Sequence, residues 1–178
     1  MSIKNFIKRR IRFLLFHLNL YSQDWEDRSL ILQAKVLMSS ESWLRKEDNL
    51  DLSSKEFRVF SQWGDDGIIQ YLINQLNIQN KFFIEFGVGN YYESNTHFLL
   101  VNNNWSGYII DGSKKKIDEV RANPFFWRYD LNLKSAFIDK NNINDLLSQS
   151  SFENIGLLHI DLDGNDYWIF DTIEIEKY

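Results

Sequence analysis

The sequence predicts an α/β fold with a doubly wound, mainly parallel sheet and a helical N-terminal extension. From residue 57 onward, short apolar runs that end in glycine or an acid alternate with stretches of helical periodicity. Strands that alternate with helices at this spacing form parallel sheets. Before residue 57 the apolar residues recur only at helical spacing. We therefore expect residues 1–56 to form a helical extension and linker, and residues 57–178 to form the α/β domain.

Composition narrows the class of protein. The chain has 178 residues, 44% hydrophobic and 16% aromatic, which suits a globular protein with a buried core. The net charge of −5 gives no support for nucleic-acid binding. Because cysteine is absent, disulfides, thiolate metal ligands and cysteine nucleophiles are excluded, and a reducing compartment such as the cytoplasm is suitable. The three histidines are scattered, so we expect no metal site built from them.

The first residues are basic and amphipathic. The segment 1–21 contains several lysines and arginines, and no acid occurs before Asp24. Its apolar run is too short to span a bilayer and leads to no small-residue cleavage site. Two interpretations remain, a helix docked on the domain or a reversible anchor at the anionic inner face of the membrane. A second helix is expected within residues 27–40, and the charged, serine-rich stretch 39–56 is the best linker candidate.

The elements of the domain follow from periodicity. Asp65 or Asp66 is expected to cap a helix whose apolar residues recur up to Leu76. Buried strands are expected within residues 81–89, 105–113, 135–139 and 155–164. Helices are expected within residues 93–104, 114–123 and 142–150, and another begins at residue 165.

The end of the first strand carries a glycine pair. Gly87 and Gly89 allow a sharp turn and let a ligand approach the main chain closely, although a simple turn is also compatible with them. The third glycine of a dinucleotide-binding fingerprint is absent. A pyrophosphate beside Glu85 would be repelled, whereas a ligand with an ammonium group suits this carboxylate.

Acids close the next two expected strands. Asp111 ends the second, where a carboxylate can accept both hydroxyls of a ribose, and a helix cap is the alternative. Asp139 ends the third, where it could bind an adenine amino group, and an ordinary loop acid is the alternative. Three successive strand ends bearing an acid fit a nucleoside without phosphate that carries an amino-acid tail. S-adenosylmethionine has that shape.

The fourth strand ends in LLHIDLDGNDYW, residues 157–168. A calcium loop is excluded because Gly164 follows too early and no closing glutamate is present. A haloacid-dehalogenase-type phosphatase needs more chain after Asp163, and a metal-dependent glycosyltransferase using Asp-x-Asp remains a minor alternative. His159, Asp161 and Asp163 point to one side if the strand stays regular, at the edge of the sheet where ligands bind.

Five blocks of the sequence resemble the FkbM-type methyltransferases, which are S-adenosylmethionine-dependent enzymes of the class I Rossmann-like fold. They lie between residues 57 and 170 and read FSQWGDDGIIQYL, FFIEFGVGNYYESNTHFLL, NNNWSGYIIDGS, AFIDKNNIN and LLHIDLDGNDYW. The resemblance implies that S-adenosylmethionine is the cofactor, with its methionine part near Glu85, Gly87 and Gly89. It further implies ribose at Asp111 and adenine near Asp139. The expected cofactor-binding set also includes Gln62 and Asn95.

The same resemblance implies O-methylation of a hydroxyl, commonly on a sugar, glycan or polyketide. An alcohol must lose its proton as the methyl bond forms, and a carboxylate or histidine within hydrogen-bond reach can accept it. Asp163 is the preferred base or acceptor-orienting group, followed by His159, and Asp161 is a further candidate. A core histidine and a structural acid are the alternatives. His97 and His159 stand where close relatives are expected to have arginine and serine.

A class I methyltransferase has a seven-stranded sheet, so the resemblance implies that the sheet is incomplete in this sequence. We expect either a fragment or a naturally short chain that a partner completes. A non-catalytic binding or scaffold module derived from such an enzyme is the alternative function. Unpaired sheet edges would favour association of identical chains.

Overall fold

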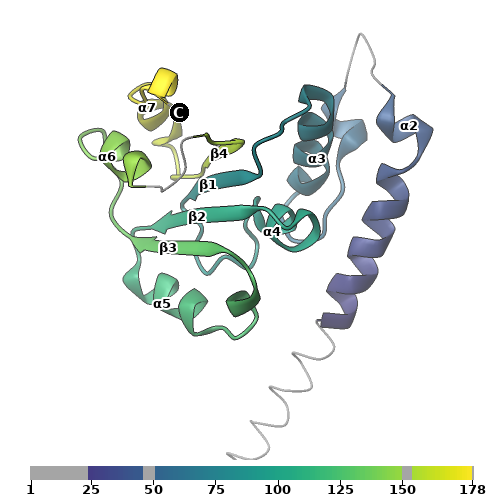
Figure 1. Cartoon of the computed structure of the whole chain (residues 1–178), viewed down its shortest axis with the longest axis horizontal. Helices are drawn as coiled ribbons and strands as arrows, with labels where there is room; N and C mark the ends of the chain where they lie inside the picture. The colour runs from purple at the N-terminus through teal and green to yellow at the C-terminus, as the bar shows by residue number, and fades with distance from the viewer. Residues whose placement is uncertain (1–23, 46–50, 150–153, 178) are drawn as a thin grey trace, which may run out of the picture. The chain divides into compact units, whose positions relative to one another are not determined.

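The computed structural model describes residues 24–45, 51–149 and 154–177 (Figure 1). The chain divides into two compact units, Met1–Arg45 and Lys46–Tyr178. In the first unit, residues 24–38 are helical, which confirms the second expected helix, and α2 (Glu41–Leu44) follows. The basic segment 1–21 lies outside the described residues. Among the residues that are described, no helix is long and apolar enough to cross a membrane.

The sheet has four strands, and all of them are parallel. They are β1 (Phe82–Phe86), β2 (Ser106–Asp111), β3 (Leu131–Ser135) and β4 (Leu157–Ile160), in the order β3-β2-β1-β4. The chain adds strands on one side of β1 and then crosses to its other side for β4. This topological switch point between β1 and β4 is where open α/β sheets bind ligands.

Helices cover both faces of the sheet, which confirms the doubly wound, Rossmann-like arrangement (Figure 1). One face packs against α6 (Ile143–Ser148) and α7 (Asp166–Phe170). The opposite face packs against α4 (His97–Asn103), α5 (Lys114–Ala122) and the 3-10 helix η2 (Phe126–Arg128). Alternate residues of β1 face opposite sides of the sheet: Phe82, Ile84 and Phe86 belong to one core, and Phe83 belongs to the other.

Residues 51–56, expected as linker, lie in the second unit. The 3-10 helix η1 (Leu52–Lys55) contacts α3 (Asp65–Leu76), where the Lys55 ammonium lies 5.0 Å from the centre of the Tyr71 ring. Gly67 permits this packing, because a Cβ there would lie 2.2 Å from the Lys55 carbonyl oxygen. The structured part of the α/β unit therefore begins before residue 57.

Two expectations about local structure are wrong. The third strand lies at Leu131–Ser135 rather than at 135–139, so Asp139 does not close it. This edge strand is only half-buried and mixes polar with apolar residues, which makes it less apparent than the apolar run after it. The N-cap of α3 is Gly64, without a side-chain hydrogen bond, so neither Asp65 nor Asp66 caps that helix. A final 3-10 helix, η3 (Ile175–Lys177), follows α7.

Candidate functional site

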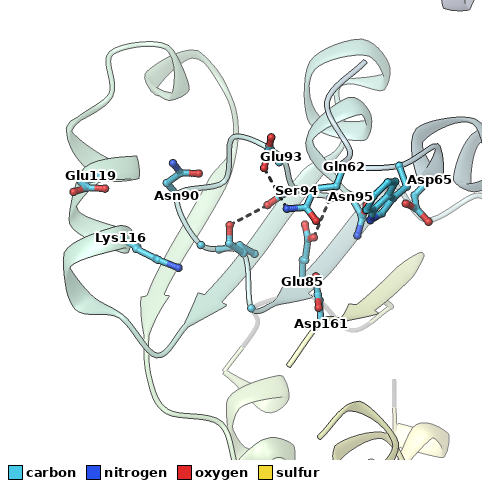
Figure 2. Close-up of a pocket in the computed structure, with 14 residues that line it drawn as sticks. Gln62, Asp65, Glu85, Asn90, Glu93, Ser94, Asn95, Lys116, Glu119 and Asp161 are labelled. Atoms are coloured by element: carbon cyan, nitrogen blue, oxygen red, sulfur yellow. Dashed lines mark hydrogen bonds between the residues drawn. The ribbon is translucent and has the colours of Figure 1, made fainter. Parts of the chain in front are cut away.

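A cavity of about 590 Å³ opens at the carboxyl end of β1, beside the switch point (Figure 2). Its lining comes from the segment before α3 and the first residue of α3, the end of β1 with its following loop, α5, and the residue after β4. The lining residues are Gln62, Trp63, Asp65, Glu85, Gly87, Val88, Gly89, Asn90, Glu93, Ser94, Asn95, Lys116, Glu119 and Asp161. The volume falls in the range of small-molecule sites, roughly 300–1,000 Å³.

Glu85 lies at the base of this cavity and is 2% exposed. Its carboxylate accepts hydrogen bonds from the N–H of Asn95 at 3.0 Å, the N–H of Thr96 at 3.2 Å and the hydroxyl of Thr96 at 2.5 Å. Burial raises the pKa of Glu85, while the nearby His159 and the hydrogen bonds oppose this shift. The carboxylate is therefore fixed in one orientation by the residues that precede α4.

His159 of β4 contacts Glu85 from the neighbouring strand. Its Nδ1 lies 3.5 Å from a Glu85 oxygen, and its Nε2 lies 3.1 Å from the side-chain nitrogen of Asn95. With the Asn95 amide nitrogen as the donor, Nε2 accepts this hydrogen bond, and Nδ1 lies on the side of Glu85. His159 thus supports Glu85 and Asn95 but does not line the cavity.

The loop after β1 that contains Gly87 and Gly89, called the glycine loop below, has backbone φ angles that residues other than glycine rarely adopt. Gly87 has φ +79°, and a Cβ at this position would lie 1.7 Å from the carbonyl oxygen of Asp161. Gly89 has φ +58°, and its N–H donates to a carboxylate oxygen of Asp111 at 2.8 Å. The two glycines therefore serve a sharp turn and a close approach of the segment after β4.

Asp111 ends β2, as predicted, and is 8% exposed. Its second carboxylate oxygen accepts the N–H of Ser113 at 2.7 Å, and Ser113, rather than Asp111, is the N-cap of α5. Asp111 lies directly behind Gly89 and is not among the cavity-lining residues. Each of its oxygens retains a further lone pair.

Two further predicted acids, Asp139 and Asp163, also lie outside the cavity lining. Asp139 accepts hydrogen bonds from the N–H groups of Asn141 and Asn142, at the start of α6. Asp163 is exposed and has φ +49° in the turn after β4. Since β4 ends at Ile160 and this turn breaks the strand geometry, Asp163 does not continue one regular strand face with His159.

The cavity is strongly acidic. Its lining carries the five carboxylates of Asp65, Glu85, Glu93, Glu119 and Asp161 and the single ammonium of Lys116. Figure 2 shows Lys116 and Glu119 on one side of Glu85, and Asp65 on the other. Such a lining attracts a cation and repels a diphosphate. Within the described part of the chain, no group of three or more acids and histidines is arranged to hold a metal ion.

Of the expected cofactor-binding residues, the cavity brings together Gln62, Glu85, Gly87, Gly89 and Asn95. Sequence reasoning did not identify Trp63, Glu93, Lys116 or Glu119, because their positions depend on loop and helix packing. A tryptophan just before the predicted helix start was the one available signal in the sequence. No protein-family model matches this chain, and no curated protein matches it.

Proposed function

We propose that this protein is an S-adenosylmethionine-dependent methyltransferase that transfers a methyl group to a hydroxyl of a sugar, a glycan or a small metabolite. The observation that carries the proposal is the buried, hydrogen-bonded Glu85 in an acidic cavity at the switch point, beside a glycine loop tied to Asp111. The FkbM-type sequence blocks supply the same residues in the same order. The absence of cysteine suits a cytoplasmic location.

The lining residues fit the charges of this cofactor. S-adenosylmethionine carries an ammonium, a carboxylate and a sulfonium, so it is a net cation, and the cavity has a large excess of carboxylates. Glu85 and Asn95 would hold the amino end, and the backbone at Gly87 and Gly89 would contact the chain of the ligand. Asp111 is outside the lining but is hydrogen-bonded to the lining residue Gly89, and it would accept the ribose hydroxyls through its remaining lone pairs. When bound, the cofactor supplies an electrophilic methyl group.

The acceptor hydroxyl must lose a proton during the transfer. Among the three expected candidates, Asp161 lines the cavity, whereas Asp163 and His159 do not. This favours Asp161 as the group that accepts the proton or orients the hydroxyl. A correctly positioned base typically contributes about 10²–10⁴-fold to the rate. His159 would act indirectly, because it orients Asn95 and Glu85.

A ligand-induced shift of the thermal unfolding midpoint tests the proposal. A ligand that binds only the folded chain stabilises it by about 2.7 kcal/mol at a hundredfold excess over its Kd. S-adenosylmethionine and S-adenosylhomocysteine should raise the midpoint, whereas UDP-glucose with manganese should not. A shift with UDP-glucose and manganese alone would favour the glycosyltransferase. No shift with any ligand would favour the non-catalytic scaffold.

A further inference from the structure

Trp63 is 83% exposed although it lines the cavity. An indole is among the largest apolar side chains, and leaving it in water forfeits the free energy that burial would provide. Its neighbours Gln62 and Asp65 line the same part of the cavity. An exposed aromatic ring beside polar side chains at a cavity rim is typical of a ligand contact.

The backbone before Trp63 is held in place by hydrogen bonds to Asp66. One oxygen of the buried Asp66 accepts the N–H groups of Val59 at 2.7 Å, Phe60 at 2.7 Å and Ser61 at 3.1 Å. In return, the Asp66 N–H donates to the Ser61 hydroxyl at 3.1 Å. Three consecutive N–H groups on one carboxylate oxygen fix the backbone immediately before Gln62 and Trp63.

Two further contacts anchor this segment to the domain. The Phe60 ring stacks on the buried His97 ring with their centres 4.0 Å apart. The Gln62 amide donates to Glu93 at 3.2 Å, which joins the segment to the loop after β1. Trp63 is therefore an exposed side chain on a segment whose backbone is held by the contacts of neighbouring residues.

Trp63 belongs to the segment before α3, whereas the glycine loop and α5 form other parts of the lining. Figure 2 shows Asp65, two residues after Trp63, on the opposite side of Glu85 from Lys116 and Glu119. Under the proposed function, the glycine loop and Asp111 bind the cofactor, so the part of the lining formed by Trp63 and Asp65 faces the remaining volume. That volume is available to the second substrate.

We propose, resting on the methyltransferase function, that Trp63 is the platform on which the acceptor ring stacks. Asp65 and Glu93 accept hydrogen bonds from hydroxyl or amino groups of that ring. Asp66 acts as a positioning residue that holds the platform. Because only Lys116 offsets the carboxylates of the lining, the acceptor class is an uncharged or cationic hydroxylated ring, and a phosphorylated or carboxylated ring is disfavoured.

The test uses the isotope-labelled indole N–H signals of the full chain in NMR titrations. The probes are methyl α-D-glucopyranoside, D-glucosamine and D-glucose 6-phosphate, each added after saturation with S-adenosylhomocysteine. The Trp63 signal is assigned by its loss in Trp63→Phe. We expect the neutral and the amino sugar to shift it, with the phosphorylated sugar at least tenfold weaker. Trp127, which is 81% exposed and does not line the cavity, is the matched control and should not shift.

Several outcomes would overturn the proposal while leaving the proposed function intact. They are an unmoved Trp63 signal with all three sugars, equal shifts at Trp127, or binding of the phosphorylated sugar as tight as that of the neutral one. Trp63→Ala should weaken sugar binding about tenfold and leave the affinity for S-adenosylhomocysteine within twofold. A large loss of affinity for S-adenosylhomocysteine in Trp63→Ala would assign Trp63 to the cofactor instead. Failure of the unaltered chain to bind S-adenosylhomocysteine would instead contradict the proposed function itself.

The positioning role of Asp66 has its own readout. Asp66→Ala removes the acceptor for three N–H groups and should weaken binding of methyl α-D-glucopyranoside about tenfold. Asp66→Asn keeps an oxygen that can accept those N–H groups, so it should restore most of that affinity. Equal sugar affinity in the unaltered chain and in Asp66→Ala, with both folded, would remove the positioning role.

Discussion

The N–H of Gly89 donates to a carboxylate oxygen of Asp111 at 2.8 Å and thereby joins the loop after β1 to the end of β2. The other oxygen of Asp111 accepts the N–H of Ser113. One acid thus fixes two loops at the carboxyl ends of the strands. Under the proposed function, its orientation is set before the ligand arrives, which lowers the cost of binding.

Replacing Asp111 should weaken binding of the adenosyl ligand. Asp111→Ala removes both tethers and the expected ribose contact, so the Kd of S-adenosylhomocysteine should rise more than tenfold while the chain remains folded. Isothermal titration calorimetry measures this change, with circular dichroism as the folding control. Asp171→Asn, at an exposed position after α7, is the matched control and should bind normally. Unchanged affinity in Asp111→Ala would remove the ribose assignment.

Glu85→Gln should affect both stability and binding. The buried carboxylate accepts three hydrogen bonds. In the glutamine variant, the amide NH₂ group would face one of the N–H or O–H groups that now donate to the carboxylate. We expect a loss of about 1–3 kcal/mol in the free energy of unfolding, measured by urea denaturation. The Kd for S-adenosylhomocysteine should rise about tenfold, because a charged contact to its ammonium is lost. Asp161→Asn, at an exposed lining position, should leave stability nearly unchanged; an equal loss in both variants would contradict this role of Glu85.

Gly87 and Gly164 both have positive φ, so alanine substitutions at the two positions can be compared directly. Alanine at Gly164, where φ is +91° and no atom lies within 4 Å of an added Cβ, carries only the backbone strain of about 1–2 kcal/mol. Alanine at Gly87 adds a collision with the Asp161 carbonyl oxygen at 1.7 Å. Gly87→Ala should therefore lower the urea midpoint clearly more than Gly164→Ala. Equal midpoints would show that the segment after β4 does not pack against the glycine loop in this way.

The strands could be predicted from the sequence where a buried strand appears as a short run of apolar residues. The strands β1, β2 and β4 are apolar runs that end in glycine or acids, and they lie where they were expected. The edge strand β3 was assigned too late in the chain, because its half-buried residues mix with polar ones and the run after it is more apolar. Phe137, in that later run, is 79% exposed beside Gly112.

The site was predictable only in part. Glu85 and the glycine loop could be identified because their chemistry depends on local spacing. From the sequence, Asp163 is preferred to Asp161, whereas Asp161 is the one that lines the cavity. The turn that separates them depends on hydrogen bonds from the N–H groups of Leu162 and Gly164 to Asp166, which spacing alone does not predict. Lys116 and Glu119 of α5 reach the cavity because of the way this helix packs. Periodicity predicts the helix but not which of its exposed residues line a cavity.

His97 should make stability depend on pH. The ring is buried among Phe60, Tyr91 and Phe126, and burial lowers its pKa from 6.5 to about 4. Between these values the unfolded chain holds a proton that the folded chain lacks. The free energy of unfolding therefore falls as pH falls through this window, by about 1.4 kcal/mol per pH unit and about 3 kcal/mol in all.

The comparison of the unaltered chain with His97→Phe isolates this effect. Phenylalanine keeps an aromatic ring in place but removes the titrating group and the contact of His97 Nδ1 with the Tyr92 carbonyl oxygen, at 3.1 Å. The buried acids Glu85 and Asp66, whose pKa values are raised by burial, give an opposite slope that is common to both proteins. Urea denaturation between about pH 7 and pH 4.5 should show a smaller decline for His97→Phe. Parallel curves for the two proteins would contradict a neutral, buried His97.

The most direct test of the methyltransferase account is isothermal titration calorimetry of the full chain with S-adenosylhomocysteine, with UDP-glucose plus manganese as the parallel titration. The account predicts saturable binding of S-adenosylhomocysteine at one site per chain, and no binding of the nucleotide sugar. An absence of S-adenosylhomocysteine binding to a chain that circular dichroism shows to be folded would contradict it.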